Sequence, residues 1–180
     1  MGAYHEGQRA LQDRFDSRRL ADRLEQVTYH DTINDGDRAF IESAPFFFLA
    51  TVDDDGVPDV SYKGGVPGFV RCVDDRTLEW PTYDGNGQFR SLGNVLVNPN
   101  VSLLFIDFEN PNRLRIQGQA ALGDDLTVRV RVDRLWPNCP RYIHRMQLEE
   151  LSVYAPRPEH EPPEPEWKQF FTDVLPGTQP

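Results

Sequence analysis

The chain has 180 residues, which suits one domain with terminal extensions, and 38% of them are hydrophobic. Its net charge of −10 and pI near 4.8 disfavour a nucleic-acid backbone or an anionic membrane surface as partner, because both attract clustered Lys and Arg. The longest apolar run, residues 44–52, is shorter than the ~20 residues that a membrane helix needs. With two cysteines, Cys72 and Cys139, and no basic-then-apolar opening, the chain is expected to be cytoplasmic.

Helices are predicted in the N-terminal region. Across residues 5–27, apolar side chains recur at roughly helical spacing between charged ones, which predicts an amphipathic helix, continuous or broken, at the surface or against a partner. Asn34 or Asp35 can cap a second, short helix over 35–44 that turns Phe40 and Ile41 inward.

From residue 46 the hydrophobic period becomes that of β-strands. Seven extended runs are separated by turn residues such as those of "DDDG". These runs predict strands near 46–53, 57–64, 68–73, 77–82, 100–108, 112–124 and 126–137. Many short strands joined by turns indicate a mainly β protein, either an antiparallel barrel or a sandwich.

A glycine-punctuated bend precedes the strand at 100–108. The sequence "FRSLGNVLVNP" (89–99) fits a short helix, so Arg90 and Ser91 would lie at its start, where backbone N–H groups and the helix dipole favour an anion. Asn94 falls one turn later and would face the same side. Alternation places Ser61 beside Lys63 on one strand face, and Arg113 beside Arg115 on another. Alternatively, Arg90 pairs with a nearby carboxylate and the glycines serve turns only.

The C-terminal part is predicted to be irregular around two helical segments. "NCPRYIHRMQL" (138–148) opens with a proline that suits the first turn of a helix. Residues 155–166 are proline-rich and acidic, as in a linker or extended arm, and "WKQFFTDVL" (167–175) would be a helical anchor. The predicted organisation is a helical extension over 1–34, a barrel domain over 35–154 and an arm over 155–180.

Familiar catalytic motifs are absent from the sequence. The histidines, His5, His30, His144 and His160, show no metal-ligand spacing, so no metal site is expected. The chain also lacks a nucleophile elbow, a P-loop and a dinucleotide-binding glycine fingerprint.

Four sequence blocks together resemble a known family. The blocks at 46–65, 82–105, 113–120 and 138–143 are similar, in this order, to the pyridoxamine 5′-phosphate oxidase-like family of FMN-binding split barrels, over roughly 36–145. The resemblance implies a six-stranded antiparallel Greek-key split barrel with peripheral helices. It also implies a homodimer that holds two FMN molecules in clefts between its subunits.

The resemblance further implies roles for individual residues. Arg90 and Ser91 would hold the FMN phosphate, and Thr82 would lie beside the phosphate or the ribityl chain. Ser61 and Lys63 would lie along the flavin, with the backbone of 60–62 facing its ring. Arg113 would reach the cofactor from the same or the other subunit. The implied cofactor-binding set is Val60, Ser61, Tyr62, Lys63, Thr82, Arg90, Ser91, Asn94 and Arg113.

The sequence indicates less clearly which residues would recognise the substrate. Cys139 would approach the flavin or substrate, Arg141 would bind a substrate anion, and Tyr142 would stack or donate a hydrogen bond. Alternatively, Cys139 is a buried thiol ahead of a helix that begins at Pro140, and Arg141 forms an ion pair.

The chain departs from the pyridoxamine 5′-phosphate oxidases proper in two places. Where they begin the second strand with a phosphate-binding arginine, this sequence has Pro58 and Asp59. It also lacks their C-terminal segment that carries Arg and Trp, because "PEPEWKQFF" does not match it. The cofactor therefore carries over better than the vitamin B6 substrate.

These observations favour an FMN-dependent oxidoreductase that transfers two electrons to or from a small molecule, with a nicotinamide or deazaflavin donor. A non-catalytic flavin- or haem-binding storage protein with the same fold is the alternative. A third hypothesis is a β-barrel interaction domain whose flavin site has decayed.

Overall fold

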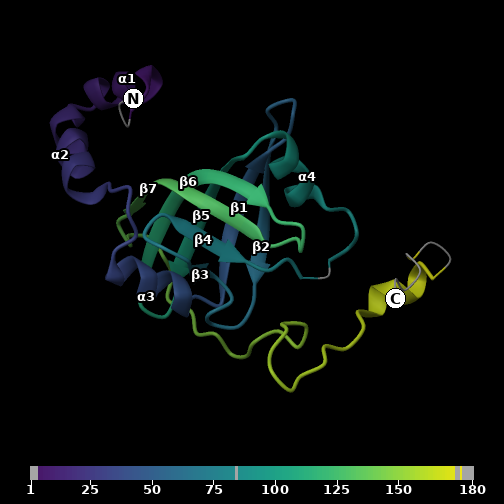
Figure 1. Ribbon diagram of the computed structural model, residues 1–180. Helices are drawn as coiled ribbons and strands as arrows, with labels where there is room; N and C mark the ends of the chain where they lie inside the picture. Colours follow the sequence, from purple (N-terminus) through teal and green to yellow (C-terminus); the bar gives the residue numbers. More distant parts are fainter. Residues whose placement is uncertain (1–3, 84, 173–174, 176–180) are drawn as a thin grey trace.

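The computed structural model describes residues 4–83, 85–172 and 175, and its body is one antiparallel β-sheet (Figure 1). The helices are α1 (Glu6–Arg14), α2 (Arg18–Thr28), α3 (Asp35–Ser43), α4 (Arg90–Val97) and the 3-10 helix η1 (Glu166–Phe170). The strands are β1 (Phe46–Val52), β2 (Pro58–Gly64), β3 (Arg71–Cys72), β4 (Thr77–Trp80), β5 (Asn100–Asp107), β6 (Asn112–Leu122) and β7 (Val128–Pro137). Among the described helices, none is long and apolar enough to cross a bilayer.

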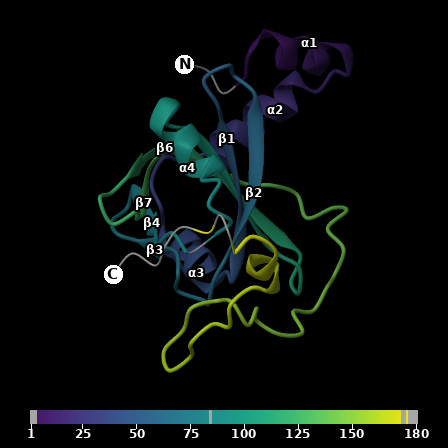
Figure 2. The ribbon, with the colours of Figure 1, turned by 90° about the vertical axis from the view of Figure 1, so that its right-hand side faces the viewer.

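The strands follow the order β2-β1-β5-β6-β7-β4-β3, and neighbours pair antiparallel throughout. The sheet curves strongly around its inner face (Figures 1 and 2). The seven extended runs of the sequence are confirmed as strands, but the number of six implied by the family resemblance is wrong. The additional strand is β3, a two-residue piece that pairs with β4 at the edge of the sheet.

Alternating apolar side chains fill the inner face of the sheet. On β1, Phe47 and Leu49 are buried between partly exposed neighbours, as period-2 patterning predicts. The Phe47 ring stacks on Phe105 and meets Trp80 edge-on, with both centroid distances at 5.0 Å. Each such fully buried side chain contributes ~1.5–3 kcal/mol, so this aromatic cluster holds β1, β4 and β5 in fixed positions around the site described below.

The two predicted helices nearest the sheet are confirmed. At the start of α3, the Asn34 side chain accepts from the Asp37 N–H at 3.0 Å, and Ile41 is buried as expected. Helix α4 lies over the sheet with Ser91, Leu92 and Val95 buried, and it ends at Asn98.

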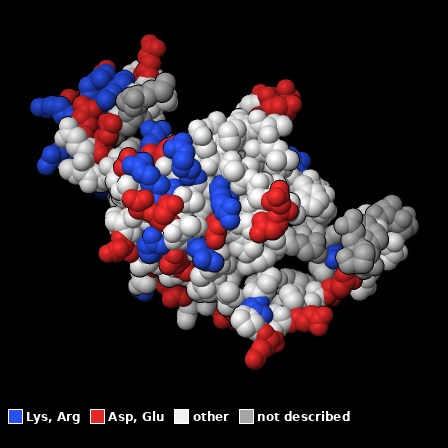
Figure 3. Space-filling view, viewed as in Figure 1, with Lys and Arg blue, Asp and Glu red and all other residues white. Residues whose placement is uncertain are grey.

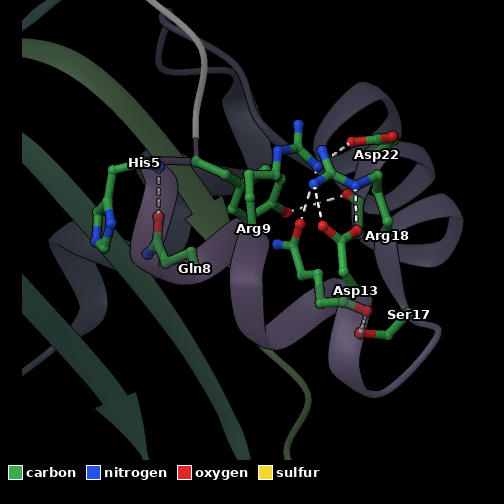
Figure 4. Close-up of polar contacts among 10 residues, drawn as sticks. His5, Gln8, Arg9, Asp13, Ser17, Arg18 and Asp22 are labelled. Carbon is green, nitrogen blue, oxygen red and sulfur yellow. Dashed lines mark hydrogen bonds and ion pairs between the residues drawn. The ribbon is translucent and has the colours of Figure 1, made fainter.

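The predicted N-terminal helix is broken into a helical hairpin that projects from the sheet (Figure 1). Asp16, at the break, has a positive φ of 47°, which a continuing helix cannot adopt. Ion pairs between Arg9 and Asp22 at 2.6 Å and between Arg18 and Asp13 at 2.5 Å connect the two helices (Figure 4). No residue of α1 or α2 is buried, so polar contacts hold this hairpin together.

The helix predicted over 138–148 is wrong, because the chain there is irregular. Ile143 N donates to the Pro140 carbonyl at 3.0 Å, but Tyr142 has a φ of 71°, which ends the turn at once. Hydrogen bonds to Glu109 then fix the path of this segment. The Glu109 carbonyl accepts one from Arg145 Nε at 3.2 Å. The predicted terminal helical segment is a 3-10 helix as far as Phe170; residues 173–174 lie outside the described residues.

Candidate functional site

A cavity of about 390 Å³ lies at one end of the sheet, between β2, β4, the start of α4 and the later segment 148–155. Its volume is within the ~300–1,000 Å³ range of small-molecule sites. The sheet side is rich in rings, which come from Phe46, Tyr62, Phe69, Trp80 and Tyr83. This lining suits a flat aromatic group.

Lys63 connects this cavity with the start of α4. Its side chain lines the cavity, and Nζ donates a hydrogen bond of 2.8 Å to the Ser91 hydroxyl, which is 8% exposed. Burial lowers the pKa of Lys63, an effect that Asp59 opposes. Because Ser91 accepts this bond, its own proton is available for another acceptor. A cation and an oriented hydroxyl therefore meet at a helix start.

The start of α4 carries features that suit an anion. Its N-cap, Phe89, adopts the left-handed conformation (φ 50°, ψ 25°) and supplies no capping bond. The first N–H groups of a helix lack intrahelical partners and favour negative charge. Arg90 follows directly, is 71% exposed, and lies 3.7 Å from an Asp59 oxygen through its Nε. Arg90 thus has the carboxylate partner of one sequence-based interpretation and the helix-start position of the other.

Three further predicted site residues bind the protein itself. Asn94 Nδ2 donates to the buried Thr51 hydroxyl at 3.0 Å, which joins α4 to β1. Thr82 Oγ1 donates to the Leu126 carbonyl at 2.6 Å while it lines the cavity. Ser61 Oγ lies 3.5 Å from the carbonyl of the paired residue Leu49. These contacts fix the frame of the cavity.

Val60 and Tyr62 point to the opposite side of β2 from Lys63, and they are 64% and 62% exposed. The Tyr62 ring stacks on Phe46 of β1 with a centroid distance of 5.4 Å and touches the cavity at its edge. The outer face of this end of the sheet therefore carries exposed apolar side chains at Val60 and Tyr62.

The remaining predicted residues lie away from the cavity. Arg113 Nη2 donates to the Cys139 carbonyl at 3.0 Å, and its buried Nε has no partner in the described part of the chain. Cys139 is exposed, so the alternative prediction of a buried thiol is wrong. Arg141 is also exposed, and Tyr142 is 87% exposed. None of these four lines the cavity. No group of three potential metal ligands occurs among the described residues.

Sequence reasoning missed two parts of the site. The left-handed Phe89 carries no sequence signal, because a phenylalanine rarely adopts that conformation. Residues 148–155 lack hydrophobic periodicity, yet they form the side of the cavity that faces the sheet.

Fold and site define a small antiparallel β protein with an aromatic cavity beside an anion-favouring helix start. A family model described as pyridoxamine 5′-phosphate oxidase matches residues 33–148, well over half of the chain. The chain belongs to the pyridoxamine 5′-phosphate oxidase-like family.

Comparison with solved structures finds distant similarity. HupZ of Group A Streptococcus is 22% identical, with 59% of this chain and 99% of that chain covered and a TM-score of 0.48. An FMN-binding protein of Syntrophomonas wolfei is 10% identical, with coverage of 72% and 97% and a TM-score of 0.46. An F420 reductase is 19% identical, with coverage of 59% and 97% and a TM-score of 0.40. No curated protein matches the chain.

Proposed function

We propose that this protein is a homodimeric FMN-dependent oxidoreductase with the split-barrel fold of its family. The observation that carries the proposal is the 2.8 Å bond from Lys63 to Ser91, which joins an aromatic cavity to the open start of α4. An aromatic ring system that ends in a phosphate matches this combination of surfaces. The phosphate would bind Arg90, Ser91 and the helix N-terminus, and the ring would occupy the cavity.

FMN, when bound, supplies hydride transfer at N5 of its ring. The protein contributes position and charge. Lys63 keeps further N–H donors beyond the one given to Ser91 and can place positive charge next to the ring. Within a partly buried site this charge acts more strongly than it would in water. The lysine therefore favours the reduced, more negative cofactor.

A second copy of the chain would complete the site. The outer face of β1 and β2 exposes Val60 and Tyr62 beside Phe46 and Phe48, whose rings contact Tyr62. Such contiguous apolar surface favours a protein interface. Arg113 does not reach this protomer's cavity, so its contact with FMN would be made across the dimer.

The substrate differs from that of a pyridoxamine 5′-phosphate oxidase. The segment "PEPEWKQFF" does not match the C-terminal segment that binds the pyridoxal substrate in those enzymes. Asp59, 3.7 Å from Arg90, also stands at the start of β2, where they have a phosphate-binding arginine. A nicotinamide or deazaflavin would serve as the electron donor.

An absorbance titration with FMN followed by anaerobic reduction tests the proposal. We expect the protein to acquire the yellow flavin bands, and NADPH, NADH or reduced deazaflavin to bleach them within seconds. FMN binding without reduction by any donor would support the storage protein. Failure to bind FMN would refute the proposal.

A further inference from the structure

One wall of the cavity comes from the C-terminal part of the chain. Residues 148–155, here called the strap, pass over the cavity opposite β2 and β4, and six of them line it: Leu148, Glu150, Leu151, Ser152, Tyr154 and Ala155. Figures 1 and 2 show the chain leaving β7 and running irregularly along the body of the molecule.

Specific bonds hold the strap in place. Leu148 N donates to a Glu109 carboxylate oxygen at 3.3 Å, which fastens its beginning to the β5–β6 turn. At its other end Ala155 is buried, and its N–H donates to the Ser152 carbonyl at 3.0 Å. A ring nitrogen of His160 lies 2.7 Å from the Val153 carbonyl. The bond to Glu109 and the burial of Ala155 therefore anchor the two ends of the strap to the body of the molecule.

The strap also changes the charge of the cavity. Among the described residues that line it, the charged ones are Lys63 on the sheet side and Glu150 on the strap. Lys63 is engaged by Ser91 at 2.8 Å and, in the proposed function, by the flavin. Glu150 is exposed, and its side chain makes no hydrogen bond or ion pair with the described part of the chain. A carboxylate is thus the free charge on the strap side.

We infer that the strap is the substrate-side wall of the flavin site and that Glu150 makes the site select uncharged or cationic aromatic substrates over anionic ones. The inference rests on the proposed function, because it requires bound FMN to contact Lys63. In the proposed function the flavin ring lies against the sheet-side rings, so the apolar surface left for a flat substrate is that of the strap, including Leu151 and Tyr154. Glu150 repels carboxylates and phosphate esters and attracts amines or amidines. Arg141, the sequence-based candidate for binding an anion, does not line the cavity.

Three naphthalene ligands of matched shape test this selection on the FMN-loaded dimer. 2-Naphthamidine, 2-naphthamide and 2-naphthoate carry charges of +1, 0 and −1 on the same ring, and calorimetry gives each Kd. We expect the amidine to bind about tenfold more tightly than the carboxylate, with the amide between them. Glu150→Gln is expected to reduce that ratio to roughly twofold. Glu149→Gln removes a neighbouring exposed charge that does not line the cavity, and we expect it to leave the ratio unchanged.

Several outcomes would overturn the inference. These are equal or tighter binding of 2-naphthoate, equal effects of the two glutamine variants, and the failure of all three ligands to bind. The absorbance of the same samples reports separately on the proposed function. A protein that stays colourless with FMN refutes that function, whereas a yellow protein with the wrong charge preference refutes only the role of Glu150. Neither substitution touches a buried group, so both variants are expected to fold.

Discussion

The phosphate role of Arg90 can be tested by removing its charge while keeping a polar side chain. In Arg90→Gln the 3.7 Å ion pair with Asp59 is lost, but the arginine is 71% exposed, and such pairs contribute ~0–1 kcal/mol. The free energy of unfolding should therefore change by less than about 1 kcal/mol. A hydrogen bond between a guanidinium and a phosphate contributes ~1.5–3 kcal/mol. The Kd for FMN is therefore expected to rise roughly 10- to 150-fold.

Asp59→Asn is the matched change on the other side of the ion pair. The carboxylate competes with phosphate for Arg90, so its removal is expected to lower the Kd for FMN by about 2- to 5-fold. Quenching of flavin fluorescence gives the two Kd values, and urea unfolding gives the two stabilities. Wild-type affinity in Arg90→Gln would show that the arginine serves its ion pair alone, and the phosphate assignment would be refuted.

Three other residues, Lys63, Cys72 and Gly118, can each be tested by one measurement. Burial lowers the pKa of Lys63, so between that lowered pKa and about 10.5 the unfolded chain binds more protons than the folded one, and the free energy of unfolding rises with pH. Urea unfolding of Lys63→Met should lack this rise. A pH profile equal to that of the wild type would contradict the lowered pKa. Burial raises the pKa of Cys72 to about 11, so a thiol reagent at pH 8 should label the exposed Cys139 rapidly and Cys72 only as the protein opens; two fast thiols would disprove the burial. A Cβ on Gly118 would collide with the Arg131 carbonyl oxygen, so Gly118→Ala is expected to cost ~1–3 kcal/mol in urea unfolding, and wild-type stability would argue against that close approach.

The strands were predictable because their pattern is local. On β7 the burial alternates from Val128 to Asp133, as the Val-Arg alternation of the sequence indicates. The same local reasoning failed for 138–148. Pro140 suits a helix start, but the path of this segment is set by Glu109, whose contacts are 36 and 39 residues away in sequence. Sequence periodicity does not report such contacts.

At the candidate site, too, local features could be predicted from the sequence and long-range contacts could not. The place of Lys63 on one strand face and that of Ser91 at a helix start could be predicted, because strand alternation and helix-start chemistry are visible in the sequence. Their direct hydrogen bond could not, since they are 28 residues apart and meet through the packing of α4 on the sheet. Glu150 could not be foreseen either, because nothing in an irregular segment indicates which of its acidic residues lines a cavity. Charges of both signs are interspersed over the visible surface (Figure 3).

Equilibrium titration with FMN and riboflavin in parallel tests most directly whether a phosphate is bound at the start of α4. The two ligands share one ring system and differ in the phosphate. We predict that FMN binds at least about tenfold more tightly, because Arg90, Ser91 and the helix N-terminus act on the phosphate alone. Equal affinities would mean that the phosphate makes no contact with the protein, and the assignment of α4 as its binding site would be wrong.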